Sequence, residues 1–364
     1  MENVAIIGGG LAGLTAALRL SATHHVTLLE ASPRLGGQIL TECCDGFVIE
    51  RGAEGFVARS EAVPQIVAEL GMPPDSLIGQ SVLASYGYQD GKLIALAPGE
   101  AAAFLGFQVP KDDLGKGIRT LRHGMGSLIA AFEDVLSQRH VELRKSAAVG
   151  AVTTARANGI TLRLEGSGET VTGDALVVAT NARNAAALLV PVVPEAEGMR
   201  DAPAMSSVTV ELAFDRQAVD HPLDGTGFVV ATNEQRDGLR ACTFTTSKFI
   251  DRAPPGRVSL RAFFRPTPQD LSDLDDDAWI ERAYASCRRI LRLEGEPLHS
   301  WVTRWDRALP VLNPAYKEAV QVLEQVLADR PIVLAGSAFH GSGIDAAVRS
   351  GMAAAQTVLD ASRI

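Results

Sequence analysis

The chain has 364 residues, enough for two domains of the usual ~100–200 residues each. Hydrophobic residues make up 46% of it, and 34 basic against 43 acidic residues give a formal charge of −9. This balance argues against the basic face that binds duplex nucleic acid and against a polybasic attraction to anionic lipid. The composition is that of a soluble globular protein rather than a disordered chain.

Neither the cysteines nor the N-terminal segment suggests secretion or a metal site. The four cysteines are Cys43, Cys44, Cys242 and Cys287. They form no C-x-x-C pair and have no histidine at zinc-ligand spacing, so we expect free thiols and no metal. Met1–Leu20 is apolar but carries Glu2 where a signal peptide has positive charge. Ala185–Val193 is too short to span a membrane. We therefore expect a cytoplasmic protein, with membrane contact at most peripheral.

The chain opens as a β-α-β unit. Val4–Ile7 and Val26–Leu29 are short β-branched or aliphatic runs typical of buried strands, and Leu11–Leu20 between them reads as a helix. Further elements follow up to residue 179. They are a helix over Glu61–Leu70, a hairpin of Leu83–Tyr88 and Lys92–Leu96 around Asp90-Gly91, a helix over Ser127–Gln138, and short strands from Val141 that end with Ala175–Ala179.

The middle of the chain favours a different architecture. The predicted strands there are Val208–Phe214, Gly227–Ala231, Ala241–Thr245 and Val258–Phe264. A helix over Asp277–Leu293, a strand over Pro331–Ala335 and a helix from Gly343 to about Leu359 complete the chain. We predict an α/β (α+β) protein in which a Rossmann-like nucleotide-binding domain (residues 1–60, 121–200 and 300–364) carries an inserted, mostly antiparallel domain (residues 61–120 and 201–299).

A glycine motif lies between the first strand and the first helix. In Gly8-x-Gly10-x-x-Gly13 the first glycine makes the tight turn, the second admits a pyrophosphate to the backbone, and the third lets the helix pack on the strand. Glu30 ends the second strand, where a carboxylate accepts hydrogen bonds from ribose hydroxyls. The alternative, a purely structural glycine-rich turn, is disfavoured by this context. The predicted cofactor contacts of this unit are Gly8, Gly10, Leu11, Ala12, Gly13 and Glu30.

A second motif follows directly. Its residues are Glu30, Ala31, Arg34, Gly36, Gly37 and Gln38, an E-x-x-x-R-x-G-G run with the residue after it. The run resembles that of the FAD-containing amine oxidases, phytoene desaturases and protoporphyrinogen oxidases, in which it marks FAD binding. This resemblance implies a non-covalently bound FAD, held by all six residues.

The resemblance continues along the chain and implies further cofactor contacts. Phe47–Glu54 is similar to the family stretch that passes the flavin ring, which assigns Gly52, Ala53 and Glu54. Val149 stands where the family holds the adenine by its backbone. The C-terminal stretch assigns Gly336, Ser337, Gly343 and Ile344, with a serine at 337 where many flavoproteins carry an acid. Trp305 is assigned as a wall of the flavin, and a plain core tryptophan is the equal alternative.

The stretches Ala241–Phe249, Arg252–Gly256, Leu260–Phe264 and Trp305–Pro310 resemble protoporphyrinogen oxidases of the bacterial type. One departure is clear: between Pro98-Gly99 and His123-Gly124 this chain lacks the long helical insertion of the family. That insertion builds part of the substrate cavity and the membrane-facing surface. Its absence implies a more open pocket.

The resemblance implies a function in haem biosynthesis. A porphyrinogen, protoporphyrinogen IX or coproporphyrinogen III, would lose hydride to flavin N5, with dioxygen or another acceptor reoxidising the flavin. We assign no protein base. Arg59 and Lys248 are the candidate cations for the substrate carboxylates, and solvated surface cations are an equal alternative for both. Another flavin oxidoreductase activity (amine oxidase or desaturase) and a non-catalytic carrier remain open, and so does a homodimer.

Overall fold

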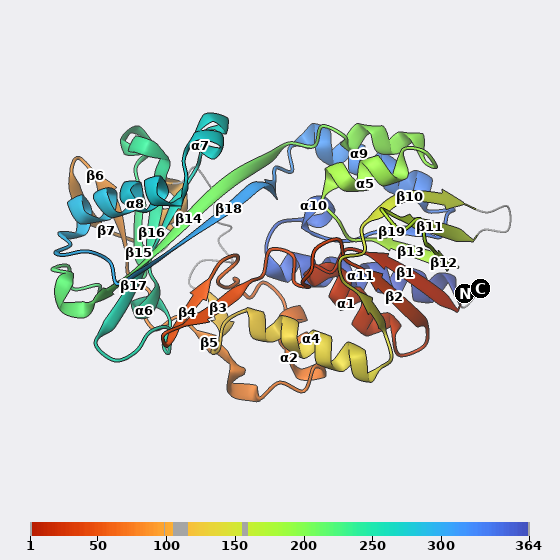
Figure 1. Ribbon diagram of the computed structural model, residues 1–364, viewed down its shortest axis with the longest axis horizontal. Coiled ribbons are helices and arrows are strands. Elements are labelled where there is room, and N and C mark those ends of the chain that lie inside the picture. The colour runs from red at the N-terminus through yellow and green to blue at the C-terminus, as the bar shows by residue number, and fades with distance from the viewer. Residues whose placement is uncertain (1, 98, 105–115, 155–158, 363–364) are drawn as a thin grey trace.

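The computed structural model describes residues 2–97, 99–104, 116–154 and 159–362. It is elongated, with a parallel sheet at one end and a larger, mostly antiparallel sheet at the other (Figure 1). The predicted α/β class with a Rossmann-like unit is confirmed. The division of the chain into two domains with the boundaries given above stays a prediction.

The parallel sheet has five strands in the order β19-β13-β1-β2-β9. Their bounds are Ile332–Leu334 (β19), Ala175–Val178 (β13), Asn3–Ile7 (β1), His25–Leu29 (β2) and Glu142–Arg144 (β9). Both of its faces are apolar, because Val4 and Ile6 of β1 enter one hydrophobic cluster and Ala5 and Ile7 enter another. Burial on both faces is typical of parallel sheets and accounts for the continuous aliphatic runs in these strands.

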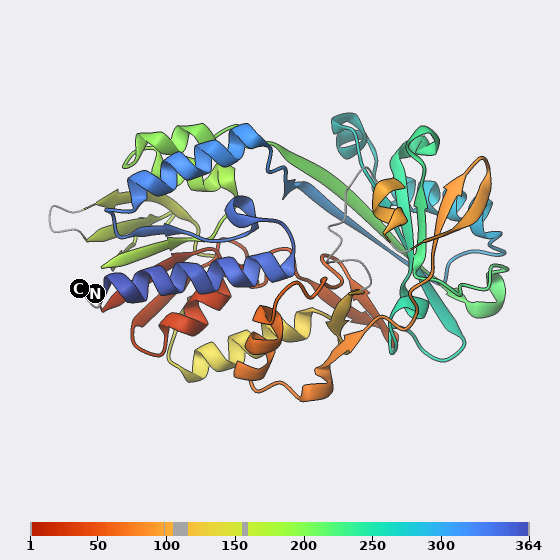
Figure 2. The same cartoon turned by 180° about the vertical axis from the view of Figure 1, so that it is seen from behind.

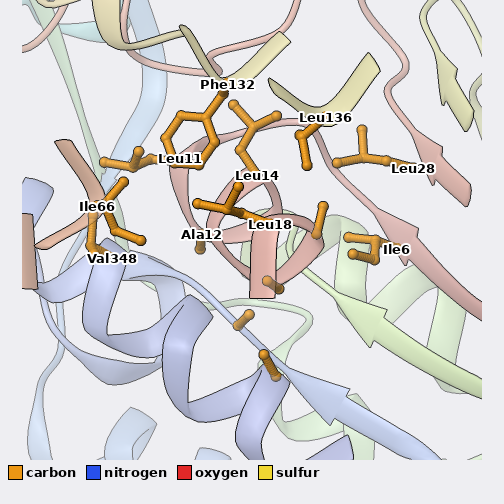
Figure 3. Packing of buried hydrophobic residues seen from close by; sticks show 14 of the residues in the cluster. Ile6, Leu11, Ala12, Leu14, Leu18, Leu28, Ile66, Phe132, Leu136 and Val348 are labelled. Carbon is orange, nitrogen blue, oxygen red and sulfur yellow. The ribbon is translucent and has the colours of Figure 1, made fainter. Parts of the chain in front are cut away.

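Helices cover the first face of this sheet. They are α1 (Leu11–Leu20), α2 (Ala62–Glu69), α4 (Gly126–Gln138) and α11 (Ile344–Ala361). Leu14 and Leu18 of α1 lie fully buried among Phe132 and Leu136 of α4 (Figure 3). The C-terminal helix α11 packs closely on α1, since a Cβ built on Gly351 would lie 2.3 Å from the carbonyl oxygen of Ala12. Figure 2 shows α11, in blue, along the side of the parallel sheet.

A three-stranded sheet and further helices cover the second face. Their bounds are Val149–Thr154 (β10), Ile160–Leu164 (β11), Thr170–Gly173 (β12), Ala182–Leu189 (α5), Pro194–Met199 (the 3-10 helix η3) and Pro314–Leu327 (α9). Asparagines begin both α helices: the side chain of Asn181 accepts a hydrogen bond from the N–H of Asn184, and that of Asn313 accepts one from Tyr316. We did not predict α5 or α9 from the sequence.

The larger sheet has seven strands in the order β18-β14-β17-β16-β15-β6-β7. Their bounds are His299–Pro310 (β18), Ala204–Asp215 (β14), Arg257–Phe264 (β17), Leu239–Phe244 (β16), Gly227–Val230 (β15), Ser85–Gln89 (β6) and Lys92–Leu96 (β7). All neighbours are antiparallel except the pair β15 and β6. The predicted antiparallel strands and the Asp90-Gly91 hairpin are confirmed, whereas β18 was not predicted. Strands β14 and β18 run together toward the parallel sheet (Figure 1).

The remaining elements are shorter, apart from α8. They are Thr41–Cys44 (β3), Phe47–Glu50 (β4), Pro74–Ser76 (η1), Leu77–Gly79 (β5), Glu100–Phe104 (α3), Arg119–Leu121 (β8), Arg216–Ala218 (η4), Thr232–Glu234 (η5), Arg236–Gly238 (η6), Thr245–Lys248 (α6), Pro268–Asp273 (α7), Asp276–Leu291 (α8) and Ser337–His340 (α10). Helix α8, capped by Asp275, buries Trp279, Ala283 and Cys287 against one face of the seven-stranded sheet.

The segment expected to replace the family's helical insertion, Pro98–His123, lies partly outside the described residues. Among the residues that are described, we find no helix long and apolar enough to cross a membrane.

Candidate functional site

The predicted phosphate-binding turn connects β1 to α1. A Cβ built on Gly13 would lie 2.0 Å from the carbonyl oxygen of Gly8, so only glycine allows this helix to approach the strand end so closely. A Cβ built on Gly10, the N-cap of α1, would meet no atom of the described chain within 4 Å. The side chains of Leu11 and Ala12 are buried, which leaves their backbone as the part that faces a ligand. The turn therefore presents a helix N-terminus to open space.

The carboxylate of Glu30 closes the other side of this turn. Its Oε2 accepts a hydrogen bond from the N–H of Gly9 at 2.7 Å, and its Oε1 accepts one from Ser32 at 2.8 Å. The second glycine pair lies against the first motif, because Gly36 forms a bridge with Gly10 and donates its N–H to the carbonyl of Gly9. The two motifs form one surface, here called the glycine cradle (Gly8–Gly13, Glu30, Gly36 and Gly37).

Arg34 and Gln38 hold the cradle rather than extend into it. The Arg34 guanidinium donates to the carbonyls of Leu35, Gly37 and Ile39, which fixes the loop after Glu30. Burial lowers the pKa of Arg34, and the charge of Glu30 opposes that shift. The side chain of Gln38 donates to the carbonyl of Ala308 at 2.6 Å, and Ala31 is exposed.

The segment after β4 lies directly beside the cradle. A Cβ built on Gly52 would lie 1.8 Å from the carbonyl oxygen of Gln38 and 3.4 Å from the ring of Trp305. The N–H of Ala53 donates to that same carbonyl at 3.2 Å, and the Trp305 indole donates to the carbonyl of Arg51 at 2.9 Å. Gly52, Ala53 and Trp305 are thus brought together at the edge of the cradle.

The predicted cofactor contacts near the C-terminus begin beside Ala12 of α1. Gly336 follows β19, and a Cβ built on it would lie 3.7 Å from the Cβ of Ala12, with Ser337 beginning α10 next to it. Gly343 is the N-cap of α11, has a φ of 96°, and faces open space. Ile344 is buried in the core. A second open helix N-terminus therefore belongs to α11, the helix that packs on α1.

Two of the predicted site residues, Val149 and Arg59, are linked to the site through their neighbours in the chain. Val149 begins β10, two residues after Ala147, whose N–H donates to the carbonyl of Glu30 at 2.8 Å. Arg59 is exposed, and the hydroxyl of its neighbour Ser60 donates to Asp345 in the first turn of α11 at 2.7 Å.

Lys248 is not the surface cation that was the alternative expectation. Its side chain is 6% exposed, and its ammonium group pairs with Oε1 of Glu54. Burial works against the ionised form of Glu54, but Lys248 and Arg261 together outweigh it and hold the pKa of Glu54 below its usual range. Glu54, which the resemblance assigned to the flavin, is therefore half of a buried ion pair.

That pair belongs to a larger group of buried charges. We call it the charged cluster; its members are Glu50, Glu54, Glu211, Lys248, Arg252 and Arg261. Arg261 is its centre. The Arg261 guanidinium lies 3.8 Å from Oε2 of Glu54 and 4.0 Å from Oε2 of Glu211, and it donates to the carbonyl of Gly52 at 2.7 Å. The cluster is thus joined to the edge of the cradle by a hydrogen bond.

Glu50 and Arg252 form the deepest part of the cluster. Glu50 accepts hydrogen bonds of 2.7 Å from the Thr41 hydroxyl and from the N–H of Met125, the N-cap of α4. Burial nevertheless raises the pKa of Glu50, against the opposing effects of that N–H and of Arg252, which lies 3.5 Å away. Arg252 is 1% exposed and donates to the Thr120 hydroxyl and the carbonyl of Leu121, both at 2.9 Å.

The residues fit a dinucleotide. Two helix N-termini with open glycine N-caps suit the charge of a pyrophosphate, and Glu30 at the end of β2 suits a ribose. The continuous path from the cradle past Gly52 to the charged cluster suits an extended cofactor whose ring system ends beside buried charges. The fold and the site define the class of a dinucleotide-binding oxidoreductase.

Comparison with known families identifies the class further. Residues 6–70 match the NAD(P)-binding Rossmann-like domain, and residues 99–359 match the flavin containing amine oxidoreductase family. The chain belongs to the flavin containing amine oxidoreductase family. It is an FAD-dependent oxidoreductase.

Relatives extend over the whole chain. The chain is 27% identical to a coproporphyrinogen III oxidase of Bacillus subtilis, over 98% of each protein. It is 32% identical to one of Propionibacterium freudenreichii over 67% of this chain and 45% of that protein. A solved structure from Exiguobacterium sp. 255-15, assigned as a protoporphyrinogen oxidase, shares the fold with a TM-score of 0.83, 23% identity and 98% coverage of both chains.

Part of the charged cluster was not predicted from the sequence. Arg252 and Arg261 lay in stretches that carried the resemblance but were given no role, and Glu50 and Glu211 were not singled out. A usable signal was present in β14 and β17, where Glu211 and Arg261 are charged residues within otherwise uncharged runs, at positions that face away from α8.

Proposed function

We propose that the protein oxidises a porphyrinogen to the porphyrin, with coproporphyrinogen III as the first candidate and protoporphyrinogen IX as the second. The observation that carries this proposal is the similarity to the Bacillus coproporphyrinogen III oxidase over 98% of both proteins. The alignment runs over 462 positions, whereas this chain has 364 residues. The present chain therefore has long gaps relative to that enzyme, which supports the proposal of a more open substrate pocket.

The chain's own residues have distinct parts in this proposal. The glycine cradle binds the pyrophosphate and Glu30 binds the ribose, while Arg34 keeps the loop between them in shape. Val149 and the Gly336–Ile344 stretch complete the cofactor contacts. When bound, FAD accepts a hydride equivalent from the substrate carbon at N5, which is chemistry that side chains alone do not supply.

The charged cluster governs the electrostatics next to that ring system. A porphyrinogen bears several carboxylates, so its site requires local positive charge although the whole chain is acidic. Lys248 and Arg261 supply buried positive charge behind Gly52, and Arg59 supplies an exposed one near the N-terminus of α11. We propose Arg59 as the group that meets a substrate carboxylate. Lys248 acts indirectly, because Glu54 already occupies it.

The proposal includes dioxygen as the electron acceptor, with hydrogen peroxide as its product. It also includes a cytoplasmic location with contact to membranes at most peripheral. A homodimer remains compatible with it.

The test is anaerobic reduction of the FAD-loaded protein by each porphyrinogen. The flavin absorption near ~450 nm is recorded before and after addition of coproporphyrinogen III or protoporphyrinogen IX, together with porphyrin fluorescence. Under nitrogen we expect bleaching of the flavin, faster with coproporphyrinogen III, and porphyrin fluorescence only once air reoxidises the flavin, because complete oxidation of one porphyrinogen requires several successive two-electron reductions of the flavin. Admission of air then restores the flavin band and produces peroxide. A flavin that stays oxidised with both compounds contradicts the proposal, and amines and isoprenoids become the next substrates to add.

A matched pair of variants separates the role of Arg59 from that of Lys248. Arg59→Gln removes an exposed charge and should raise the KM for the substrate, with a change in stability of at most about 1 kcal/mol, the range of interactions between exposed charges. Lys248→Met removes the partner of Glu54 and should lower the melting temperature. Equal kinetics of Arg59→Gln and wild type would remove Arg59 from the substrate site.

A further inference from the structure

We propose that Glu211 holds a proton at neutral pH, which leaves Lys248 and Arg261 to share the single carboxylate of Glu54 and directs the excess positive charge, through Arg261, at the backbone of Gly52 beside the cofactor. Glu211 is then a positioning residue that sets the charge next to the bound flavin without touching it. The proposal rests on FAD binding, not on the identity of the substrate.

The position of Glu211 in its strand removes its carboxyl group from water. Val210 and Leu212, its neighbours in β14, point into the apolar cluster under α8, so Glu211 points to the opposite face of the sheet. On that face it lies opposite Arg261 of β17 and Trp301 of β18 in the strand register. It is 3% exposed. A carboxylate here is removed from water and must rely on its neighbours.

The neighbours of Glu211 do not satisfy an ionised carboxylate. Within the described residues, neither oxygen of Glu211 accepts a hydrogen bond of good geometry, and its contacts with the hydroxyls of Ser259 and Thr245 are weak. Arg261, the nearest cation, is 4.0 Å away and directs its hydrogen bond to Gly52 instead. Burying a charged carboxylate without hydrogen bonds is costly, and such groups take up a proton instead.

The charged and titratable groups around Glu211 do not offset the effect of its burial. Burial raises its pKa; Arg261 and the hydroxyls of Ser259 and Thr245 oppose that shift, and the charge of Glu54 adds to it. From the segment after α6, Arg252 interacts with Glu211 over a longer range. From β16 the buried thiol of Cys242, whose pKa is raised by burial and by Cys287, points to the α8 face of the sheet but still interacts electrostatically with Glu211. Trp301 contributes no charge. Burial outweighs the cations, so the pKa of Glu211 lies above its usual range.

The consequence concerns the cofactor. Charge near the flavin ring changes how readily it accepts electrons. A neutral Glu211 leaves Arg261 and Lys248 to share Glu54, whereas an ionised Glu211 cancels the excess positive charge. We therefore expect loss of the proton from Glu211 to make the bound flavin harder to reduce.

The test compares FAD-loaded wild type with Glu211→Gln, which imitates the protonated form, and with the control Glu281→Gln on the exposed side of α8. The midpoint potential of the bound flavin is measured from about pH 5 to about pH 9. We expect wild type and Glu211→Gln to agree at the acid end, and the potential of wild type to fall below that of the variant as pH rises. Glu281→Gln should follow wild type throughout. An offset between Glu211→Gln and wild type that is the same at every pH would overturn the proposal.

Thermal unfolding over the same pH range gives a readout independent of the flavin. Because the pKa of Glu211 is raised in the folded state, the stability contributed by its proton is complete below about pH 4.3, the ordinary value, and is lost as pH rises through the folded pKa. Gln has no proton to lose, so the melting temperature of Glu211→Gln should rise relative to wild type with increasing pH. A variant that becomes less stable relative to wild type as pH rises would show that Glu211 is an ionised partner of Arg261, contrary to the proposal.

A second substitution covers the case in which Glu211→Gln does not fold. Ser259→Ala removes a hydroxyl that favours the ionised form of Glu211, without changing any charge. It should shift the pH at which the potential begins to fall to higher values. An unshifted curve would contradict the proposal.

Discussion

The two large sheets of this protein use their faces differently. The parallel sheet buries both faces in apolar clusters, and its ligand site lies beyond the strand ends, where the backbone of two helix N-termini is open. The seven-stranded sheet packs one face in an apolar cluster under α8, and its other face, which is also buried there, carries the charges of Glu211 and Arg261. Thus the first sheet offers its backbone to a ligand, and the second places charged side chains on a buried face.

This difference determines which substitutions each region tolerates. In the parallel sheet, charge is absent from the strand interiors and the constraint is close approach of backbone atoms, as at Gly13 and Gly52. In the charged cluster, the constraint is electrostatic balance in a place that water does not reach. Substitutions in the cluster should therefore cost more stability than substitutions in the cradle, and their effects should depend on pH.

The largest effect is expected at Arg252. Arg252→Met removes a cation that is 1% exposed and leaves Glu50 buried without it, which should cost about 3–5 kcal/mol of unfolding free energy. Urea unfolding at neutral pH measures this loss. The control is Arg257→Met, at the start of β17. Arg257 forms a partly exposed ion pair with Asp215, and such a pair is worth about 0–1 kcal/mol. Equal losses in both variants would show that the Arg252 pair is no more important than a surface pair.

The next effect is expected at Glu54, with a pH dependence opposite to that of Glu211. Glu54→Gln leaves Lys248 and Arg261 without their shared carboxylate and should cost on the order of 3 kcal/mol at neutral pH. The pKa of Glu54 is lowered in the folded state, so its contribution is present above about pH 4.3 and is lost as pH falls through the folded value.

Thermal unfolding from neutral to acid pH checks this sign. The melting temperatures of wild type and Glu54→Gln should approach each other as pH falls. If their difference instead widens toward acid, the ion pair with Lys248 does not hold the pKa of Glu54 down, and the contrast between an ionised Glu54 and a protonated Glu211 is wrong.

The same substitution, glycine to alanine, should have different effects at two positions of the glycine cradle. Gly13→Ala places a methyl group 2.0 Å from the carbonyl of Gly8 and should destabilise the protein by about 1–3 kcal/mol even without FAD. Gly10→Ala meets no described atom within 4 Å and has a φ of −73°, so the apoprotein should keep its stability. It should nevertheless bind FAD at least ~10-fold more weakly, or about 1.4 kcal/mol, because the methyl group occupies the space of the pyrophosphate.

Thermal unfolding of the apoproteins and FAD titration followed by flavin fluorescence measure the two effects separately. If Gly10→Ala binds FAD as tightly as wild type does, the pyrophosphate does not lie against the N-terminus of α1.

The two regions also differ in how far the sequence predicts them. The cradle depends on contacts between residues close in the chain, and its spacing from Gly8 to Glu30 predicts both the β-α-β unit and the ligand. The charged cluster joins residues as distant as Glu50, Glu211 and Arg261, and local patterns contain no information on which buried acid meets which arginine. The resemblance pointed to Lys248 but not to its partner Glu54.

Strand β18 and helix α9 were not predicted, for different reasons. Strand β18 carries Arg304, Asp306 and Arg307, so it does not read as apolar, and it forms because β14 offers a full-length partner. Helix α9 could have been predicted, because Asn313-Pro314 is a helix start and its buried side chains recur at helical spacing. The failure to predict β18 has a physical cause, because a strand requires a partner strand that the local sequence does not reveal.

The smallest effect is expected at Trp305, where the two regions meet. Trp305→Phe keeps an aromatic ring on β18 but loses the hydrogen bond from the indole to the carbonyl of Arg51, worth about 0.5–1.5 kcal/mol. If the ring is a wall of the flavin, the loosened Arg51-Gly52 segment should also change the absorption spectrum of bound FAD and weaken its binding. If it is a plain core tryptophan, unfolding will register the lost hydrogen bond while the flavin spectrum and the FAD affinity stay those of wild type. Gly52, the residue after Arg51, accepts a hydrogen bond from Arg261 of the charged cluster. A spectral change in Trp305→Phe that is absent from Trp301→Phe, on the same strand, would therefore place the contact between cradle and cluster at Arg51-Gly52.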